Sequence, residues 1–257
     1  MFRDEAQEAG NIFGGPGYPP VVPRDPQAGV TRRELLKLSP ALLLGAFAVP
    51  SLRDKLLSAG VRFSDAVSGA IFRSRHPAPV FADRDVVPFE NFPYNYFDVV
   101  DPGVDLDAWT LRVSGAVSRP GAYQLDQIRS LPRVRHNTRH ICVEGWDVIG
   151  RFGGARISDF LDLIGADPTA SYVTVTCADK YYESLDMATA RHPQSLLCYE
   201  MYDRPLDRGH GAPLRLQMPT TLGYKQAKYL MTLDVQHVLP AKRSYWGDQG
   251  YSWYGGL

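Results

Sequence analysis

Cysteine is scarce in this chain, whose 257 residues include only Cys142, Cys177 and Cys198. An odd number excludes a closed framework of disulfides, and no pair has the CxxC spacing of a zinc site or a haem attachment motif. At least one thiol is therefore left over. In an exported protein, such a thiol needs a chemical reason to be present.

An excess of charge is also missing, because 28 basic residues balance 28 acidic ones. Phosphate contacts need a concentrated basic face, so we expect no nucleic-acid partner. The chain has neither a GxGxxG nor a GxxxxGK phosphate loop, which argues against a nucleotide-binding enzyme. The residues that are present, 44% hydrophobic and 22% charged with 23 Gly, 20 Pro and 14 Tyr, indicate a globular, strand-rich protein with many turns and one sizeable core.

The amino-terminal part resembles a targeting segment more than a part of the folded domain. Residues 1–30 are polar and rich in Pro and Gly, which predicts a flexible segment. Residues 31–52 begin with TRRELLK and continue with an apolar run that Pro40 interrupts, too short for a spanning helix of about 20 residues. Paired arginines before such a run resemble a twin-arginine export signal, and Ala46–Ala48 offers a small-x-small cleavage site. We therefore expect export to the periplasm in the folded state. An ordinary amphipathic helix beginning with Arg-Arg is the alternative.

Residues 53–75 are predicted to form an amphipathic helix or linker. The apolar residues of this segment, together with Leu52 just before it, recur at close to helical spacing. They are Leu52, Leu56, Phe63, Val67 and Ile71. The helix could pack on the domain that follows, or lie at a membrane surface or a partner. Packing is the favoured interpretation.

Residues 76–257 form the predicted catalytic domain. The runs at 109–115, 172–177 and 213–219 alternate as half-buried strands do. Residues 124–131 and 157–163 read as short helices, the second with Ser158 as a plausible N-cap. Strands dispersed among short helices predict an α+β fold with a mixed sheet.

The chemistry is densest at residues 139–146, RHICVEGW. Cys142 lies among basic residues and a carboxylate, and neighbouring Arg139 and His140 are expected to favour the thiolate that a soft, high-valent metal requires. Glu144, two residues on in an extended segment, would share the side of Cys142 and could exchange a proton near the metal. A buried, inert cysteine is the default alternative for a single thiol.

This run resembles the cysteine motif of the sulfite oxidase family of molybdopterin-dependent oxidoreductases, and CVEGW is similar to that of the stand-alone bacterial periplasmic methionine-sulfoxide-reductase type. Residues 152–161, FGGARISDFL, continue the resemblance, since family members carry an aromatic-x-Gly turn before a helix. The resemblance covers about residues 88–240. It implies the mixed-sheet molybdopterin-binding fold, a Mo-molybdopterin cofactor and Cys142 as both a catalytic residue and the ligand to molybdenum, with Glu144 as the second catalytic residue.

The resemblance also implies a set of cofactor contacts. The HGAPLR and GYKQAK segments look like those that grip the pyranopterin and its phosphate, and NYFD resembles the segment over the cofactor. An aromatic loop packed on the core is the alternative for NYFD, and a core cysteine is nearly as plausible for Cys177. The implied cofactor contacts are Asn95, Phe97, Asp98, Cys142, Cys177, His210, Arg215, Gln226, Ala227 and Lys228.

Two functions follow from different classes. The first is an enzyme that transfers an oxygen atom to or from a small or protein-bound substrate, and retention of both the cysteine and the Arg/Lys clamp favours it over a cofactor-free binding module. Sulfite dehydrogenase-type oxidation would need a cationic pocket, to which Arg139, His140, Arg151 and Arg156 could contribute. Glu144 would oppose an anion, which slightly favours reduction of a neutral sulfoxide. Because no cytochrome or dimerisation domain is expected, we predict a monomeric catalytic subunit that exchanges electrons with a membrane haem protein or a soluble cytochrome.

Overall fold

The computed structural model describes residues 52, 55, 59, 60, 63, 67 and 76–257, and the chain divides into two compact units, Met1–Arg53 and Asp54–Leu257. Apart from residue 52, the segments predicted as flexible (1–30) and as an export signal (31–52) lie outside the described residues, so both stay predictions. None of the helices in the part of the chain that the structure describes is long and apolar enough to cross a membrane.

The described positions between 52 and 67 are helical, in agreement with the predicted helix. Of its apolar side chains, Leu52, Phe63 and Val67 are exposed. Leu56 and Ile71 lie outside the described residues. Packing of this helix on the catalytic domain therefore stays a prediction.

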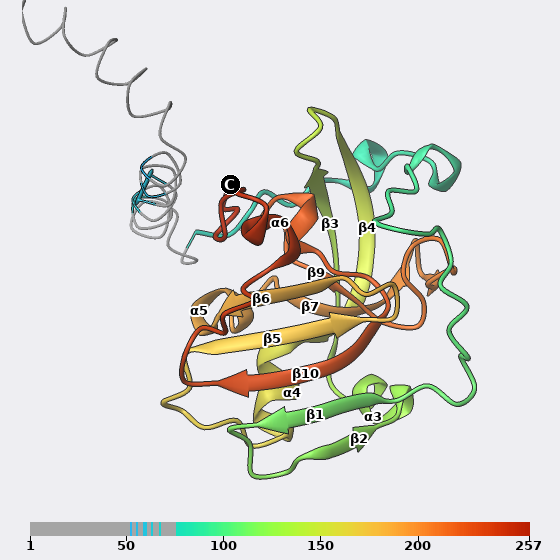
Figure 1. Ribbon diagram of the computed structural model, residues 1–257. Helices are drawn as coiled ribbons and strands as arrows, with labels where there is room; N and C mark the ends of the chain where they lie inside the picture. Colours follow the sequence, from blue (N-terminus) through green and yellow to red (C-terminus); the bar gives the residue numbers. More distant parts are fainter. Residues whose placement is uncertain (1–51, 53–54, 56–58, 61–62, 64–66, 68–75) are drawn as a thin grey trace, which may run out of the picture. The chain divides into compact units, whose positions relative to one another are not determined.

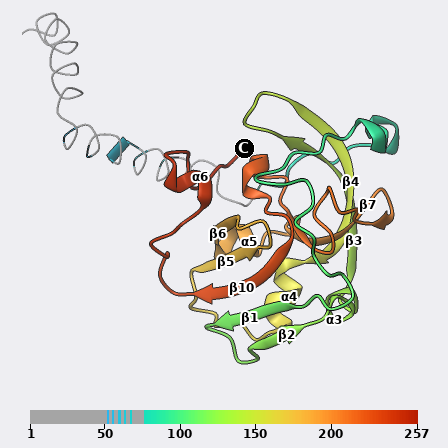
Figure 2. The same cartoon turned by 45° about the vertical axis from the view of Figure 1, so that its right-hand side comes forward.

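Two five-stranded sheets form the body of the second unit (Figure 1, Figure 2). The first has the order β2-β1-β10-β5-β6, and the second has the order β3-β4-β7-β8 with β9 paired to β7. Within residues 76–257 the strands pair antiparallel except for β1 and β10, which are parallel. The strands are β1 (Leu111–Gly115), β2 (Gly121–Tyr123), β3 (Arg133–Ile141), β4 (Asp147–Arg156), β5 (Tyr172–Cys177), β6 (Tyr182–Asp186), β7 (Leu196–Met201), β8 (Arg204–Pro205), β9 (Arg215–Gln217) and β10 (Leu230–Gln236).

The helices between these strands are short. They are η1 (Asp83–Asp85), η2 (Phe89–Asn91), α3 (Leu125–Arg129), α4 (Ile157–Leu163), α5 (Met187–Ala190), η3 (Gly223–Lys225) and α6 (Tyr245–Asp248). A mixed first sheet and an antiparallel second sheet, joined by short helices, confirm the α+β prediction. The larger core lies between α4 and the first sheet, where Phe160 and Leu161 pack with Leu111, Val175 and Leu233. A smaller core around Phe152 lies at the second sheet.

Local sequence patterns predicted the boundaries of two elements correctly. β5 and α4 have the predicted bounds, and β5 alternates buried Val173, Val175 and Cys177 with more exposed residues. Ser158 was wrong as the N-cap, because β4 runs directly into α4 and Arg156 takes that position without a side-chain cap. The Ile157 amide donates to the carbonyl of Ser195 on the neighbouring segment, which satisfies one of the free amides at the start of the helix.

The predicted aromatic-x-Gly turn before α4 was also wrong. Gly153 and Gly154 lie inside β4, where the pairing with β7 shifts register between them. A Cβ on Gly154 would lie 2.2 Å from the Leu197 carbonyl oxygen, so glycine is required by the close approach of the two strands. The bend in this segment is therefore a bulge in a strand.

The predicted extended course of residues 139–146 needs a correction. Strand β3 ends at Ile141, and residues 142–146 form the turn of the β3–β4 hairpin, which projects from the second sheet (Figure 1). The Cys142 amide donates to the Trp146 carbonyl at 2.9 Å, and Gly145 has a φ of 91°, a conformation that favours glycine. This tight turn, not an extended strand, brings Glu144 back toward Cys142.

Candidate functional site

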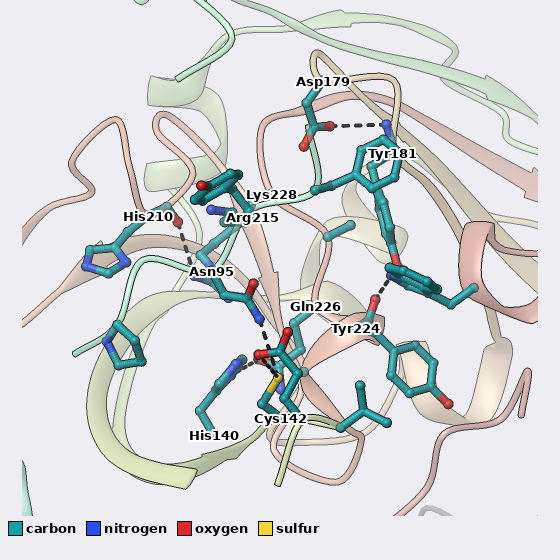
Figure 3. Close-up of a pocket in the computed structure, with 18 of the residues that line it drawn as sticks. Asn95, His140, Cys142, Asp179, Tyr181, His210, Arg215, Tyr224, Gln226 and Lys228 are labelled. Atoms are coloured by element: carbon teal, nitrogen blue, oxygen red, sulfur yellow. Dashed lines mark hydrogen bonds between the residues drawn. The ribbon is translucent and has the colours of Figure 1, made fainter. Parts of the chain in front are cut away.

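A cavity of about 910 Å³, including the space at its mouth, opens beside this hairpin turn. Five separate stretches of chain line it, at residues 92–97, 140–144, 179–181, 210–228 and 246. Figure 3 shows side chains from these stretches pointing toward one another around Cys142 and Asn95. The structure therefore brings together most of the residues that the sequence singled out.

Cys142 is buried in the wall of this cavity, 6% exposed. Asn95 Nδ2 donates to Cys142 Sγ at 3.4 Å, and the thiol lies 3.7 Å from Glu144 Oε2. Trp146 Nε1 donates to the same carboxylate oxygen at 3.0 Å, which fixes the exposed Glu144 side chain over the turn. The cysteine, the amide and the carboxylate thus form one contiguous group.

The expectation that neighbouring basic residues favour the thiolate was wrong. Burial raises the pKa of Cys142, the Arg139 guanidinium pairs with Asp147, and burial lowers the pKa of His140 to about 3, so that this imidazole is neutral. Without a metal the site favours the neutral thiol. A coordinated cation itself removes the thiol proton, so the ligand prediction does not depend on neighbouring charges.

One wall of the cavity carries basic side chains, the buried His210 and Arg215 and the partly buried Lys228, and we call these three residues the basic wall. Arg215 is 4% exposed and donates from Nη1 to the His210 carbonyl (3.1 Å) and from Nε to the Leu216 carbonyl (3.3 Å). Lys228 Nζ donates to the Gly209 carbonyl at 2.8 Å. Among the described side chains, neither Arg215 nor Lys228 has a carboxylate within ion-pair distance.

This absence of counter-charge shows in the proton affinities. Loss of solvation and the nearby Arg215 charge lower the pKa of Lys228 to about 7 and the pKa of His210 to about 4. Buried His210 Nε2 also has no hydrogen-bond partner within the described part of the chain. Arg215 and Lys228 have carbonyl partners but no carboxylate within ion-pair distance in the described part of the chain, so an anion would stabilise this site.

Gln226, an expected cofactor contact, lines the cavity and is also hydrogen-bonded within the protein. Its Oε1 lies 3.3 Å from His140 Nδ1, and its Nε2 donates to the carbonyls of Met218 and Thr221. The side-chain amide is thereby engaged within the protein and orients His140 toward the cavity. Ala227 lines the cavity, as predicted for a residue close to a cofactor.

Several residues named from the sequence do not line the cavity. Asp98 is exposed, and Cys177 is buried at the end of β5 in the larger core, where burial raises its thiol pKa. The prediction of a cationic pocket for sulfite was mostly wrong, because of the four basic residues named for it only His140 lines the cavity. The three arginines are held elsewhere by carboxylates, in the ion pairs Arg139–Asp147, Arg151–Asp203 and Arg156–Asp159.

Most of the opposite wall of the cavity could not be expected from the sequence. Asp179, Tyr181, Tyr224 and Trp246 line the cavity, and of these only Tyr224 belongs to a motif that suggested a site, GYKQAK. For Trp246 the available signal was the aromatic density of the segment that begins at residue 244, SYWGDQGYSWY. Asp179 is buried, its carboxylate accepts from the Tyr181 amide at 3.1 Å, and burial raises its pKa.

Comparison with known proteins assigns this geometry to a class. The family profile of the oxidoreductase molybdopterin binding domain matches residues 98–246. A putative protein-methionine-sulfoxide reductase subunit, YedZ1, of Azospira oryzae is 43% identical over 205 residues, which are 79% of this chain and 77% of the relative. The protein-methionine-sulfoxide reductase catalytic subunit MsrP of Xanthomonas campestris is 30% identical over 193 residues, or 67% of this chain and 59% of the relative.

The fold has a solved counterpart. The sulfane dehydrogenase SoxCD of Paracoccus pantotrophus superposes with a TM-score of 0.50 at 17% identity, covering 53% of this chain and 40% of that one. At this identity the likeness concerns the fold alone. It agrees with the mixed-sheet, molybdopterin-binding fold that the sequence predicted.

Proposed function

The chain belongs to the family of oxidoreductase molybdopterin-binding domains, and we propose that it is a molybdenum-dependent enzyme that reduces sulfoxides. The observation that carries this proposal is the cavity itself, where a buried cysteine lies opposite cations that lack carboxylate partners. The sulfoxide reductase names of the relatives supply the substrate class.

The residues present fit the cofactor. Arg215 and Lys228 would bind its anionic phosphate, because charge-assisted contacts would replace the weaker carbonyl partners of these two basic side chains. Cys142 would supply the protein sulfur ligand to molybdenum. When bound, the cofactor supplies the two-electron oxygen-atom chemistry.

Reduction of a sulfoxide consumes two electrons and two protons and gives a thioether and water. Glu144 is suited to deliver these protons, because its carboxylate lies 3.7 Å from Cys142 Sγ and reaches solvent. Trp146 Nε1 holds Glu144 Oε2 in this place through its hydrogen bond. Asn95 donates to the sulfur from the other side and would keep the ligand oriented.

The cavity favours a neutral substrate over sulfite. Two carboxylates, Asp179 and Glu144, line it, and the three arginines that could have formed an anion pocket are paired outside it. Arg215 and Lys228 would already be occupied by the cofactor phosphate. A polar but uncharged oxide therefore meets less electrostatic opposition than an anion does.

Electrons would come from a separate protein, either a membrane haem protein or a soluble cytochrome, with the chain acting as a monomeric catalytic subunit. We also propose that the protein acts in the periplasm after export in the folded state. The TRRELLK segment supports this location, because a protein loaded with a complex cofactor in the cytoplasm has to be exported folded.

The test is turnover by molybdenum-loaded protein with a reduced dye as electron donor. We expect methionine sulfoxide to be reduced, and sulfite not to be oxidised with an electron-accepting dye. Fast sulfite oxidation without sulfoxide reduction would overturn the substrate assignment. Absence of molybdenum and of any turnover from protein made in a host with the cofactor would overturn the enzyme itself.

A further inference from the structure

The cavity has a second wall whose chemistry differs from that of the basic wall. We call it the aromatic wall, and it consists of Phe97, Tyr181, Tyr224 and Trp246. In Figure 3, Tyr181 and Tyr224 lie across the site from His210, with Cys142 between the two sides. Burial raises the pKa of the Tyr181 phenol, which donates to the Tyr224 carbonyl at 2.6 Å and stays neutral. The four side chains of the aromatic wall carry no charge.

Packing behind this wall fixes its shape. The Tyr245 ring lies 4.3 Å from Phe97, 5.8 Å from Tyr181 and 5.3 Å from Trp246, measured between ring centroids. Helix α6, which carries Trp246, is held at its start by Ser244, whose Oγ accepts from the Gly247 amide at 3.0 Å. These contacts make Trp246 part of a preformed surface.

The mouth of the cavity continues this apolar character. Tyr96 and Val143 line the cavity and are 53% and 47% exposed, so apolar groups extend from the aromatic wall to the solvent. A phosphate-bearing cofactor has no cationic partner on this side. The aromatic wall is thus left for the other molecule that must enter the site.

We propose that the aromatic wall is the substrate subsite, that it binds the apolar substituents of a neutral sulfoxide, and that Trp246 determines the preference for large substituents. This inference rests on the proposed function. Sulfur and its methyl groups contact aromatic rings favourably, and a second ring can stack or meet Trp246 edge to face. The negative ring faces, together with Asp179, would oppose an anion such as sulfite.

The test compares two substrates that differ in one substituent, dimethyl sulfoxide and methyl phenyl sulfoxide, in wild type, Trp246→Ala and Trp246→Phe. For Trp246→Ala we expect the KM of methyl phenyl sulfoxide to rise about tenfold, equivalent to about 1.4 kcal/mol, with kcat little changed. The KM of dimethyl sulfoxide should change less than about twofold, and Trp246→Phe should restore most of the preference, because a ring is retained.

A binding measurement separates the subsite from catalysis. Methyl phenyl sulfone keeps the substituents but lacks the reducible sulfoxide, and its Kd by calorimetry on the loaded protein should also rise about tenfold in Trp246→Ala. Molybdenum per chain should stay at the wild-type value. The matched control is Tyr251→Leu, which removes a ring contact with Trp246 (5.2 Å) but leaves the cavity wall intact, and should leave both sulfoxides unaffected.

Equal changes for the two sulfoxides in Trp246→Ala, or no change in either, would overturn the inference. An effect of Tyr251→Leu as large as that of Trp246→Ala would also overturn it, because general packing of α6 would then be the cause. If the wild-type enzyme reduces no sulfoxide, the proposed function fails on its own. The sulfone Kd then still decides whether Trp246 binds the apolar substituents.

Discussion

Replacing Arg215 by Met should have opposite effects on cofactor retention and on the stability of the cofactor-free protein. Arg215 is 4% exposed and its charge has only the carbonyls of His210 and Leu216 as partners. A charge-assisted contact with a phosphate contributes about 1.5–3 kcal/mol. Its loss corresponds to about tenfold to hundredfold weaker retention of the cofactor.

The same substitution should leave the empty protein as stable as wild type, or slightly more stable. It removes two hydrogen bonds from a charged donor to carbonyls, worth about 1.5–3 kcal/mol each. It also removes a buried charge that has no counter-charge and whose desolvation costs several kcal/mol, and Met has a comparable volume. If Arg215 instead stabilised the fold through a buried ion pair, its replacement would lower the free energy of unfolding by about 3–5 kcal/mol.

The assay uses protein from hosts with and without molybdopterin synthesis. Elemental analysis after dialysis gives molybdenum per chain, and urea unfolding of the cofactor-free protein gives the free energy of unfolding. Arg208→Met is the matched control, because Arg208 is close in sequence but half exposed and paired with Asp101. A folded Arg215→Met protein with wild-type molybdenum content would refute the reasoning. So would a loss of about 3 kcal/mol or more in the cofactor-free state.

Three further predictions concern the ligand, the export signal and the second clamp residue. Cys142→Ser should abolish molybdenum-dependent turnover while Cys198→Ser keeps most of it, and persistent turnover in the first variant would rule out the ligand assignment. Arg32→Lys with Arg33→Lys should leave the protein in the cytoplasm, and an unchanged periplasmic fraction would show that residues 31–52 are an ordinary helix. The pKa of Lys228 is lowered to about 7 in the folded state, so the unfolded chain binds more protons than the folded one between pH 7 and 10. The free energy of unfolding of the cofactor-free protein should therefore rise by about 1–2 kcal/mol from pH 7 to 9, allowing for the partial exposure of Lys228. Urea unfolding at both pH values should show this rise disappear in Lys228→Met, and an equal rise in the variant would contradict the assignment.

The sequence predicted those parts of the fold whose signals are local. The alternation of β5 and the helical spacing of α4 lie within single short segments, and both elements have the predicted bounds. The hairpin turn at residues 142–146 was missed because its motif resembles an extended run, and only Gly145, with its φ of 91°, marks the reversal. Cys142 and Glu144 could still be predicted to lie close together, because both a turn and a strand can place residues i and i+2 on the same side.

Of the aromatic wall, Phe97 was named from the NYFD segment, but Tyr181 and Trp246 could not be predicted, for a different reason. These two side chains reach the cavity through tertiary packing, and their own sequence neighbourhoods carry no ligand-binding pattern. Arg151 shows the converse error, since its position beside the cysteine motif suggested a substrate contact, whereas ion pairs with Asp83 and Asp203 hold it outside the cavity. Charge type can be read from a sequence, but the partner that neutralises a charge cannot.

The parallel pairing of β1 with β10 determines when during synthesis the first sheet, and with it the cofactor site, can form. Ser114 Oγ donates to Asp234 Oδ1, 120 positions further along the chain, so the central strand of the first sheet arrives long after its neighbour. At about 5–20 residues per second, a ribosome needs about 6–24 s to synthesise that interval. For most of this time Cys142 has been synthesised, while Lys228 and Trp246 have not. A nascent chain would therefore present the proposed metal ligand before it could retain the cofactor, and we expect loading to follow synthesis of both walls.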